Sequence, residues 1–341
     1  MKSRITRITA ALLAAVLSLG LLVGCKPKKE LIRYTTIFYD VFDTVTTLVL
    51  HAESEKEADA WAEKLHERLT FYHRLYSIYD TFDGVTNLRT VNERAGETVQ
   101  VAREIVDLLT FGKDAFARTE GAVNIAMGSV LQLWHEARDA AKLPSTAALA
   151  AAAEHCDMEN LRIDETAGTV CLADPAMRLD VGAIAKGFAG ERLADYAREL
   201  GIESALFSLG GNVVAVGDKG GEPFVIGVED PRDLQSYTVK VAARNLAVVT
   251  SGDYQRYFTL DGVRYHHLID PETRYPAQLF RAVTVVGADS GVADMLSTAL
   301  FLLPQEAGAA LLKKYDGYAA MWTDADGKQI FSDNFESLLY N

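Results

Sequence analysis

The spacing of apolar residues divides the chain into short strands and amphipathic helices. Residues 35–50 alternate between apolar and polar positions, which predicts two short strands or one bent strand with the break at Phe42-Asp43-Thr44. A helix should follow, because Ser54 and Glu57 have the spacing of a capping box and apolar residues then recur at helical spacing. This core-facing stripe consists of Ala58, Trp61, Ala62, Leu65, Leu69 and Tyr72.

The middle of the chain is predicted to be mainly helical. In residues 76–92 the apolar residues recur at neither helical nor strand spacing, and turn-forming residues are frequent. This indicates a long loop, and loops of this length in a compact domain tend to be functional. Amphipathic helices are expected over residues 103–118, after residue 121 and over residues 144–156. His135, at the polar end of the second of these, is expected to be a solvated helix residue.

The second half of the chain is dominated by predicted strands. Residues 161–172 should form a hairpin, and strands are expected within residues 208–217, 224–231, 237–243, 247–251 and 282–287. Residues 237–243 and 247–251 are expected to continue the sheet. Helices should end before Gly201 and begin at Ala293. Because no internal repeat or linker separates these elements, we expect a single α/β domain at residues 35–341.

The first 34 residues read as a targeting segment and a tether. Three basic residues precede an apolar run over residues 8–23, which is shorter than the roughly 20 residues of a membrane-spanning helix. We interpret residues 1–24 as a signal peptide, with a transmembrane anchor as the alternative. The tetrapeptide LVGC, ending at Cys25, resembles the lipobox of bacterial lipoproteins. We therefore expect a lipid on Cys25, a tether over residues 25–34 and a location at the outer face of the cytoplasmic membrane.

Charge and cysteine content narrow the possible partners. The formal net charge is −13, and it becomes −16 when the three basic residues of the signal peptide are removed. No basic stripe is present, so we expect no nucleic-acid partner. Cys156 and Cys171 do not have metal-ligand spacing, and two buried thiols or one disulfide remain the alternatives.

Candidate catalytic side chains are concentrated in residues 247–277. A hairpin turning at Asp261-Gly262 leads into His266 and His267, and Asp270 follows in an Asp-Pro turn. Imidazole and carboxylate groups in a loop favour general acid–base chemistry. A half-buried strand with hydrogen-bonded histidines is the alternative interpretation.

Two further stretches are suited to phosphate and metal. Gly182 and Gly187 lie between a predicted strand and a helix, where exposed backbone N–H groups can hold phosphate, although tight packing alone would also require them. Asp294 and Thr298 are four residues apart on one helix face, and their oxygens suit Mg²⁺. A capping Asp and a packed Thr are the alternative.

Six motifs in order resemble the ApbE family of FAD:protein FMN transferases. They are LDVGAIAKGFAGE, SLGGNVVAVG, FVIGVEDP, VVTSGDYQRYF, YHHLIDPETRYPA and ADMLSTALF. The resemblance implies binding of FAD and Mg²⁺, and transfer of FMN through a phosphoester to a Thr of a target protein, with release of AMP. It also implies a single T-fold-like α/β domain in which helices flank a largely antiparallel sheet.

The resemblance assigns roles to individual residues. Asp294, Thr298 and the main-chain carbonyl of Ala183 match metal ligands, and Ser297 in the same motif is a further candidate ligand. His267 matches the catalytic histidine and is expected to act as general base, while His266 is structural and Asp270 orients the loop or the imidazole. The flavin nucleotide is expected to contact Phe42, Tyr79, Ala122, Val123, Asn124, Asp180, Lys186 and Leu268.

The chain departs from the family pattern at three places. Phe42-Asp43-Thr44 stands where Met-Gly-Thr is frequent, Asn124 replaces a frequent Asp, and Arg274 stands where a Gly often follows Thr. The expected acceptors are extracytoplasmic subunits or FMN-binding domains of membrane redox complexes. Two other functions stay open: an FAD pyrophosphatase that passes FMN to water, and a lipoprotein that binds flavin without turnover.

Overall fold

The computed structural model describes residues 31–340. Its centre is an eight-stranded sheet in which all neighbouring strands are antiparallel. In order across the sheet the strands are β1 (Ile32–Val41), β2 (Thr44–Ala52), β6 (Ser204–Leu209), β7 (Asn212–Gly217), β10 (Ala247–Gly252), β13 (Ala282–Gly287), β14 (Ala319–Thr323) and β15 (Gln329–Phe331). The expected α/β fold with a largely antiparallel sheet is therefore confirmed.

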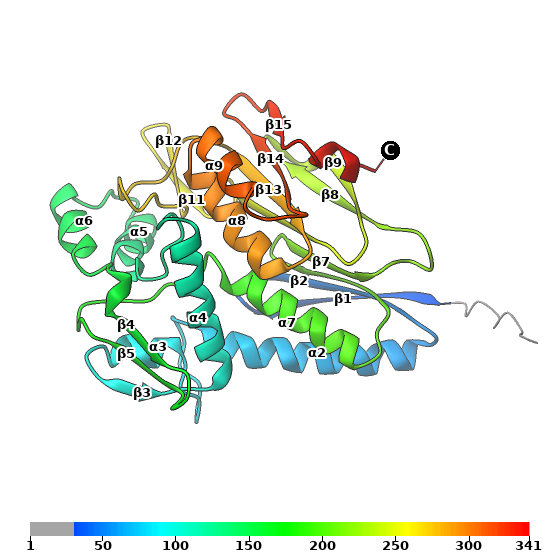
Figure 1. The fold of residues 1–341 in the computed structure, drawn as a ribbon, viewed down its shortest axis with the longest axis horizontal. Coiled ribbons are helices and arrows are strands. Elements are labelled where there is room, and N and C mark those ends of the chain that lie inside the picture. Colours follow the sequence, from blue (N-terminus) through cyan, green and yellow to red (C-terminus); the bar gives the residue numbers. More distant parts are fainter. Residues whose placement is uncertain (1–30, 341) are drawn as a thin grey trace, which may run out of the picture.

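Helices cover one face of this sheet. Figure 1 shows α2 (Glu55–Tyr76), α7 (Ala185–Glu199) and α8 (Ser290–Leu302) side by side along it. α2 begins as predicted, because the Ser54 hydroxyl accepts a hydrogen bond from the Glu57 N–H at 3.3 Å. Leu65 of α2 and Leu296 of α8 are fully buried in the resulting core. α9 (Gln305–Leu312) follows α8 and packs against it.

The opposite face is covered by a separate two-stranded ribbon, β8 (Phe224–Asp230) and β9 (Asp233–Ala243). Ile226 and Val241 of this ribbon form a second apolar cluster with Val248 and Val286 of the main sheet. Val249 and Val285, the next residues on the same strands, belong to the helix-covered core, because successive strand residues point to opposite faces. The prediction that residues 237–243 continue the main sheet was wrong, since both strands layer onto its face instead.

Smaller elements enclose one end of the sheet. A three-stranded sheet joins β3 (Thr98–Gln100), β5 (Thr169–Leu172) and β4 (Leu161–Asp164), and helix α4 (Arg103–Arg118) lies against it. The hairpin predicted at Asp261-Gly262 is confirmed as β11 (Tyr257–Leu260) and β12 (Val263–His266). The remaining elements are α3 (Leu88–Glu93), α5 (Gly128–Ala140), α6 (Thr146–Ala153), η1 (Met158–Asn160) and η2 (Phe335–Leu338).

Several predicted boundaries need correction. The loop over residues 76–92 ends early because Asn87 caps α3, accepting a hydrogen bond from the Thr90 N–H. α8 begins at Ser290, capped by Asp289, so Asp294 lies in its second turn and not its first. β1 begins at Ile32, inside the range that we assigned to the tether. The predicted signal peptide and Cys25 lie outside the described residues.

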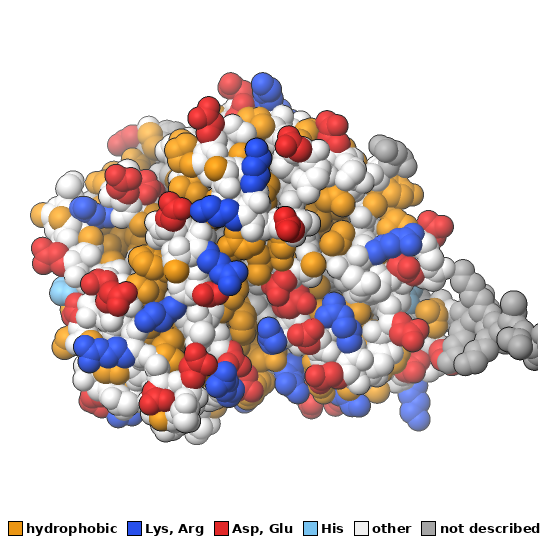
Figure 2. Space-filling view, viewed as in Figure 1, with side chains coloured by type: hydrophobic (Ala, Val, Ile, Leu, Met, Phe, Trp, Pro, Cys, Tyr) orange, Lys and Arg blue, Asp and Glu red, His pale blue; other side chains and the backbone are white. Residues whose placement is uncertain are grey.

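The surface and the cysteines complete this description. On the helix-covered face, acidic and basic side chains are interspersed (Figure 2). None of the helices within residues 31–340 is long and apolar enough to cross a membrane. Cys156 and Cys171 are both free thiols.

Candidate active site

One pocket of about 790 Å³ collects most of the residues that the sequence singled out. It is bounded by the β1–β2 turn, the loop after α2, the start of α7, the end of β10, the segment after β12 and one face of α8. Ser297 and Asp270 are the two predicted site residues that do not line it. Those that do are Phe42, Tyr79, Ala122, Val123, Asn124, Asp180, Ala183, Lys186, His267, Leu268, Asp294 and Thr298.

Three oxygen donors meet where α7 and α8 touch. Asp294 is 3% exposed, and its Oδ2 accepts a 2.8 Å hydrogen bond from the Gly187 N–H. Gly187 is the third residue of α7, where a main-chain N–H has no acceptor within the helix, and the Asp294 carboxylate supplies one. The Ala183 carbonyl lies just before the helix and accepts no hydrogen bond from residues 31–340. The Thr298 hydroxyl lines the pocket one turn after Asp294. A carboxylate, a carbonyl without a partner and a hydroxyl together form a donor set that fits Mg²⁺.

The electrostatics of Asp294 favour a cation in this place. Burial raises the pKa of its carboxyl group, which means that the isolated carboxylate is unfavourable here. The charge of Lys186, the Gly187 N–H and the Asn212 amide oppose this effect only in part. No cluster of three or more His, Cys, Asp and Glu side chains able to hold a metal occurs within the described range. A site with a single carboxylate leaves most coordination positions to phosphate and water, as is usual for Mg²⁺.

Ser297 supports this site from behind. It is fully buried, and its hydroxyl donates to the Asp294 carbonyl at 2.9 Å. The Ser251 hydroxyl at the end of β10 lies 2.8 Å from Ser297 Oγ and 3.4 Å from Thr298 Oγ1. The structure thus places Ser297 in a hydroxyl network behind the pocket wall, where it holds Thr298 and α8 against β10.

His267 projects into the same pocket from the end of the β11–β12 ribbon. Its main-chain N–H donates to the Arg256 carbonyl at 3.1 Å. Its ring Nδ1 is buried and has no hydrogen-bond partner among the described residues, so Nε2 is the nitrogen that can be reached from the pocket. Burial, together with the charges of Arg256 and Lys186, lowers the pKa of His267 to about 3. The imidazole is therefore neutral at physiological pH and can accept a proton.

His266 and Asp270 are directed elsewhere. His266 Nδ1 accepts from the Leu268 N–H at 3.2 Å, so its Nε2–H donates to the Ala277 carbonyl at 2.6 Å. Asp270 accepts from the Glu272 N–H and from the Thr273 hydroxyl, at 2.9 and 3.0 Å. Of the two alternatives for Asp270, its contacts are those of a residue that orders the loop, and none of them involves His267.

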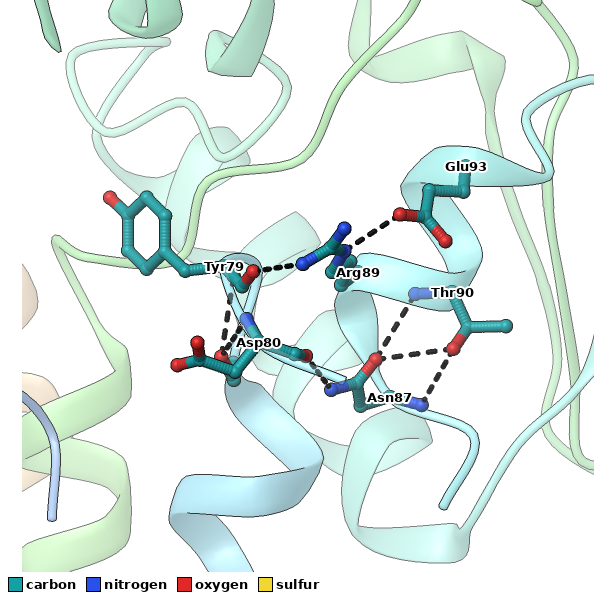
Figure 3. Close-up of polar contacts among 7 residues, drawn as sticks. Tyr79, Asp80, Asn87, Arg89, Thr90 and Glu93 are labelled. Atoms are coloured by element: carbon teal, nitrogen blue, oxygen red, sulfur yellow. Dashed lines mark hydrogen bonds and ion pairs between the residues drawn. The ribbon is translucent and has the colours of Figure 1, made fainter. Parts of the chain in front are cut away.

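Tyr79 lines the pocket, and polar contacts with the start of α3 hold its loop in place (Figure 3). The Arg89 guanidinium donates to the Tyr79 carbonyl and pairs with Glu93 at 2.7 Å. The Asn87 amide donates to the Asp80 carbonyl at 2.9 Å, which joins this loop to the start of α3. Tyr79 is about half exposed, so its ring is free to stack on a planar ligand.

The departures from the family pattern have structural counterparts. Phe42 and Asp43 both have positive φ, at 57° and 50°, and the Phe42 N–H donates to His73 Nδ1 at 3.1 Å. Asn124 uses its amide nitrogen to donate to the Cys156 carbonyl at 3.0 Å, a bond that a carboxylate could not make. Arg274 has a φ of 64° and does not line the pocket.

The pocket also contains residues that sequence reasoning missed. Arg256, Asn212 and Ser251 line it. His135 does so too, with its Nδ1 3.5 Å from the Tyr79 hydroxyl, so the expectation of a solvated helix residue was wrong. Burial lowers the pKa of His135. The only sequence signal for these residues was that Ser251, Arg256 and Asn212 fall inside the quoted motifs.

Comparisons with known proteins agree with this geometry. The sequence model described as "ApbE family" matches residues 42–322. A protein of Treponema pallidum (strain Nichols) named "FAD:protein FMN transferase" is 37% identical over 256 residues, covering 70% of this chain and 71% of that protein. One of Klebsiella pneumoniae (strain 342) with the same name is 33% identical over 277 residues, covering 80% and 85%.

A solved structure shows the same fold. The crystal structure of the ApbE protein from Thermotoga maritima superimposes with a TM-score of 0.82 at 29% sequence identity, covering 91% of this chain and all of that one. The apo form of the Pseudomonas stutzeri flavinyl transferase ApbE gives a TM-score of 0.75 at 28% identity, covering 91% and 96%. Fold, pocket and sequence therefore agree that this chain belongs to the ApbE family.

Proposed function

We propose that this chain is an FAD:protein FMN transferase that joins FMN to a Thr hydroxyl of a target protein. The observation that carries the proposal is the pairing, in one pocket, of a neutral His267 with the donor set of Asp294, Thr298 and Ala183. A hydroxyl nucleophile needs a base, and a pyrophosphate needs its negative charge balanced. The names of the relatives support the same reaction.

The reaction can be written with the residues of this pocket. The acceptor Thr oxygen attacks the phosphorus of the FMN half of FAD, and the bond from that phosphorus to the bridging oxygen breaks. AMP leaves with the bonding electrons, and the Thr proton passes to His267 Nε2. Lys186 and Arg256, whose charges both reach His267, would attract the phosphates. The products are a Thr–FMN phosphoester, AMP and one proton.

Mg²⁺ is the metal that the donor set fits. Asp294, the Thr298 hydroxyl and the Ala183 carbonyl would hold it, and when bound it would neutralise charge on the pyrophosphate. Tyr79, which lines the pocket, would stack on the flavin ring, and Asp180 and Asn124 would line the remainder of the nucleotide site.

The location and the acceptors are part of the same proposal. The basic start, the short apolar run and Cys25 support a lipid-anchored protein at the outer face of the cytoplasmic membrane. Its acceptors would then be extracytoplasmic domains of membrane redox complexes. Replacing Cys25 with Ser should release the protein from the membrane fraction, and a Cys25→Ser protein that stays in that fraction would refute the lipid anchor.

The decisive experiment is a mass measurement. The chain from Lys26 onward is incubated with FAD, Mg²⁺ and a flavin-acceptor domain, and the intact mass of that domain is recorded. A gain of one FMN phosphoester, absent when the acceptor Thr is replaced by Val, establishes the transferase. Release of free FMN and AMP without a mass gain would identify a pyrophosphatase, and FAD left intact would identify a binding protein.

A further inference from the structure

A buried carboxylate between two arginines lies directly behind the candidate active site. Asp253, which follows β10, is 5% exposed. Its Oδ1 accepts from Nη1 of Arg264 on β12 at 2.9 Å, and its Oδ2 accepts from Nη1 of Arg281, just before β13, at 2.7 Å. Its main-chain N–H also donates to the Arg281 carbonyl at 2.9 Å. We call these three residues the Asp253 clamp; it joins three separate segments of the chain.

The clamp connects the two halves of the proposed chemistry. Ser251, two residues before Asp253, contacts Ser297 and Thr298 in the candidate cation site. Arg264 lies on β12, three residues before His267. The carboxylate of Asp253 therefore couples the position of the β11–β12 ribbon, which carries His267, to the strand that supports Thr298.

The ribbon depends on this coupling because its two faces are supported differently. One face packs through Tyr265 on Trp134, with ring centroids 5.9 Å apart. The other face borders a second cavity of about 480 Å³, which is lined by all three clamp residues and by Gly262 at the hairpin turn. Close packing on this side is therefore incomplete: His266 packs edge-on against Phe301 of α8, with ring centroids 5.5 Å apart, and polar contacts add to it. These are the clamp and the hydrogen bond of His266 to the Ala277 carbonyl.

The Arg264 guanidinium is itself fixed in orientation. It lies over the ring of Tyr257, 4.3 Å from the centroid, in addition to its bond to Asp253. Arg264 and Tyr257 lie on opposite strands of the ribbon. An Arg side chain that contacts both a ring and a carboxylate has little conformational freedom. The position of β12 relative to Asp253 is therefore well defined.

We propose that Asp253 is a positioning residue for His267, and that it sets the placement of the imidazole relative to the candidate cation site through Arg264. The inference rests on the proposed transferase function. A displacement of about 1 Å at a reacting group can reduce a rate about 100-fold, so a carboxylate outside the pocket can control the reaction. A purely structural role would instead affect stability and ligand binding together with activity.

The test uses Asp253→Asn, which keeps the shape but weakens both arginine contacts. Its matched control is Asp195→Asn, because Asp195 on α7 also lies between two arginines, Arg198 at 2.9 Å and Arg192 at 3.6 Å, away from the pocket. We expect Asp253→Asn to lower kcat for FMN transfer about 10- to 100-fold, while the Kd for FAD changes less than about threefold. Asp195→Asn should leave kcat and Kd unchanged.

A second readout does not depend on turnover. In protein with ¹³C-labelled histidine rings, the NMR titration of His267 should move upward from its low pKa in Asp253→Asn, as the ring gains solvent, and stay in place in Asp195→Asn. An unchanged titration, or equal losses of FAD affinity, stability and kcat, would overturn the positioning role. If the parent protein transfers no FMN, the proposed function fails by itself, and the titration still decides the role of Asp253.

Discussion

The main-chain N–H of Gly187 in α7 donates a 2.8 Å hydrogen bond to the Asp294 carboxylate in α8. The two helices approach so closely here that a Cβ atom on residue 187 would collide with the Asp294 Cβ and with the Ser290 carbonyl. The glycine therefore has two effects: it lets the helices touch, and it brings an unpaired N–H at the start of α7 within hydrogen-bond reach of the Asp294 carboxylate. Tight packing, one of the two roles that the sequence left open for Gly187, is therefore present, and it places α7 directly against the candidate cation ligand Asp294.

Gly187→Ala should impair both properties. The added methyl group must push α7 from α8, which typically costs about 1–3 kcal/mol and outweighs the roughly 1 kcal/mol that Ala gains in a helix. We expect a lower Tm, measured by calorimetry, and a weaker stabilisation of the protein by Mg²⁺. Gly190→Ala, one turn later, is the matched control, because its Cβ would lie no closer than 3.3 Å to any neighbour. An equal response of both variants would contradict this account.

Asp294→Asn should stabilise the metal-free protein. Burial raises the pKa of Asp294 above its ordinary 3.8, so the carboxyl favours folding at low pH and this contribution is lost as the pH rises through the folded-state pKa. Near pH 7 the variant should therefore melt above the parent without metal, and the advantage should disappear below about pH 4. Mg²⁺ should raise the Tm of the parent only. A Mg²⁺ response in the variant would refute the metal assignment.

His267→Ala should separate binding from chemistry. Loss of a general base typically reduces a rate about 10²- to 10⁴-fold, whereas the flavin contacts of the pocket remain. We expect FMN transfer, followed by the mass of the acceptor domain, to fall by this factor while FAD quenching still reports binding. A parallel loss of FAD affinity would instead make His267 a pocket residue without a catalytic role.

The same histidine should make the protein sensitive to acid. Its folded-state pKa of about 3 lies below the ordinary 6.5, so the unfolded chain binds the proton first as the pH falls. The contribution of the neutral ring to stability is complete above pH 6.5 and is lost between there and about pH 3. When the pH is lowered from about 7 to 4.5, the free energy of unfolding of His267→Gln, measured with urea, should therefore fall by about 2 kcal/mol less than that of the parent. Identical pH profiles would show that the pKa of His267 is the same in the folded and the unfolded chain.

Local sequence signals predicted much of the fold. The Ser54 cap, the Asp261-Gly262 turn and the apolar stripe of α2 depend on residues a few positions apart, and the structure contains all three. The alternation of apolar and polar residues could not predict which sheet β9 joins. Such alternation identifies the buried face of a strand but not the element that covers this face. β9 accordingly lies on the face of the main sheet.

In the candidate site, too, short sequence motifs predicted some residues, whereas contacts between distant segments could not be predicted. The candidate cation ligands and His267 followed from motifs, but His135 reaches Tyr79 across 56 residues of sequence, and Asp253 reaches Arg281 across 28. Neither pairing leaves a periodic or compositional signal, because the tertiary fold alone brings the partners together. The side chains that surround and position a site are therefore harder to predict than those that the motif contains.

Arg274→Gly should stabilise the fold through the backbone alone. Arg274 has a φ of 64°, a conformation that costs a non-glycine residue roughly 1–2 kcal/mol, whereas glycine adopts it freely. Its main chain is fixed there, since its N–H donates to the Asp270 carbonyl at 2.7 Å and its own carbonyl accepts from Trp134 Nε1 at 2.9 Å. Glycine also gives the unfolded chain a greater conformational entropy, which offsets part of this effect. A net increase of about 0.5–1 kcal/mol in the free energy of unfolding remains.

The control for this prediction is Arg274→Ala, which removes the same charge and side chain but keeps the Cβ atom. Calorimetry should show a Tm rise of about 2 °C for the glycine variant and none for the alanine variant. Transfer activity should be retained in both, because Arg274 does not line the pocket. If alanine stabilised the protein as much as glycine, the cause would be the guanidinium group and not the left-handed backbone, and the departure from the family pattern would then be electrostatic in origin.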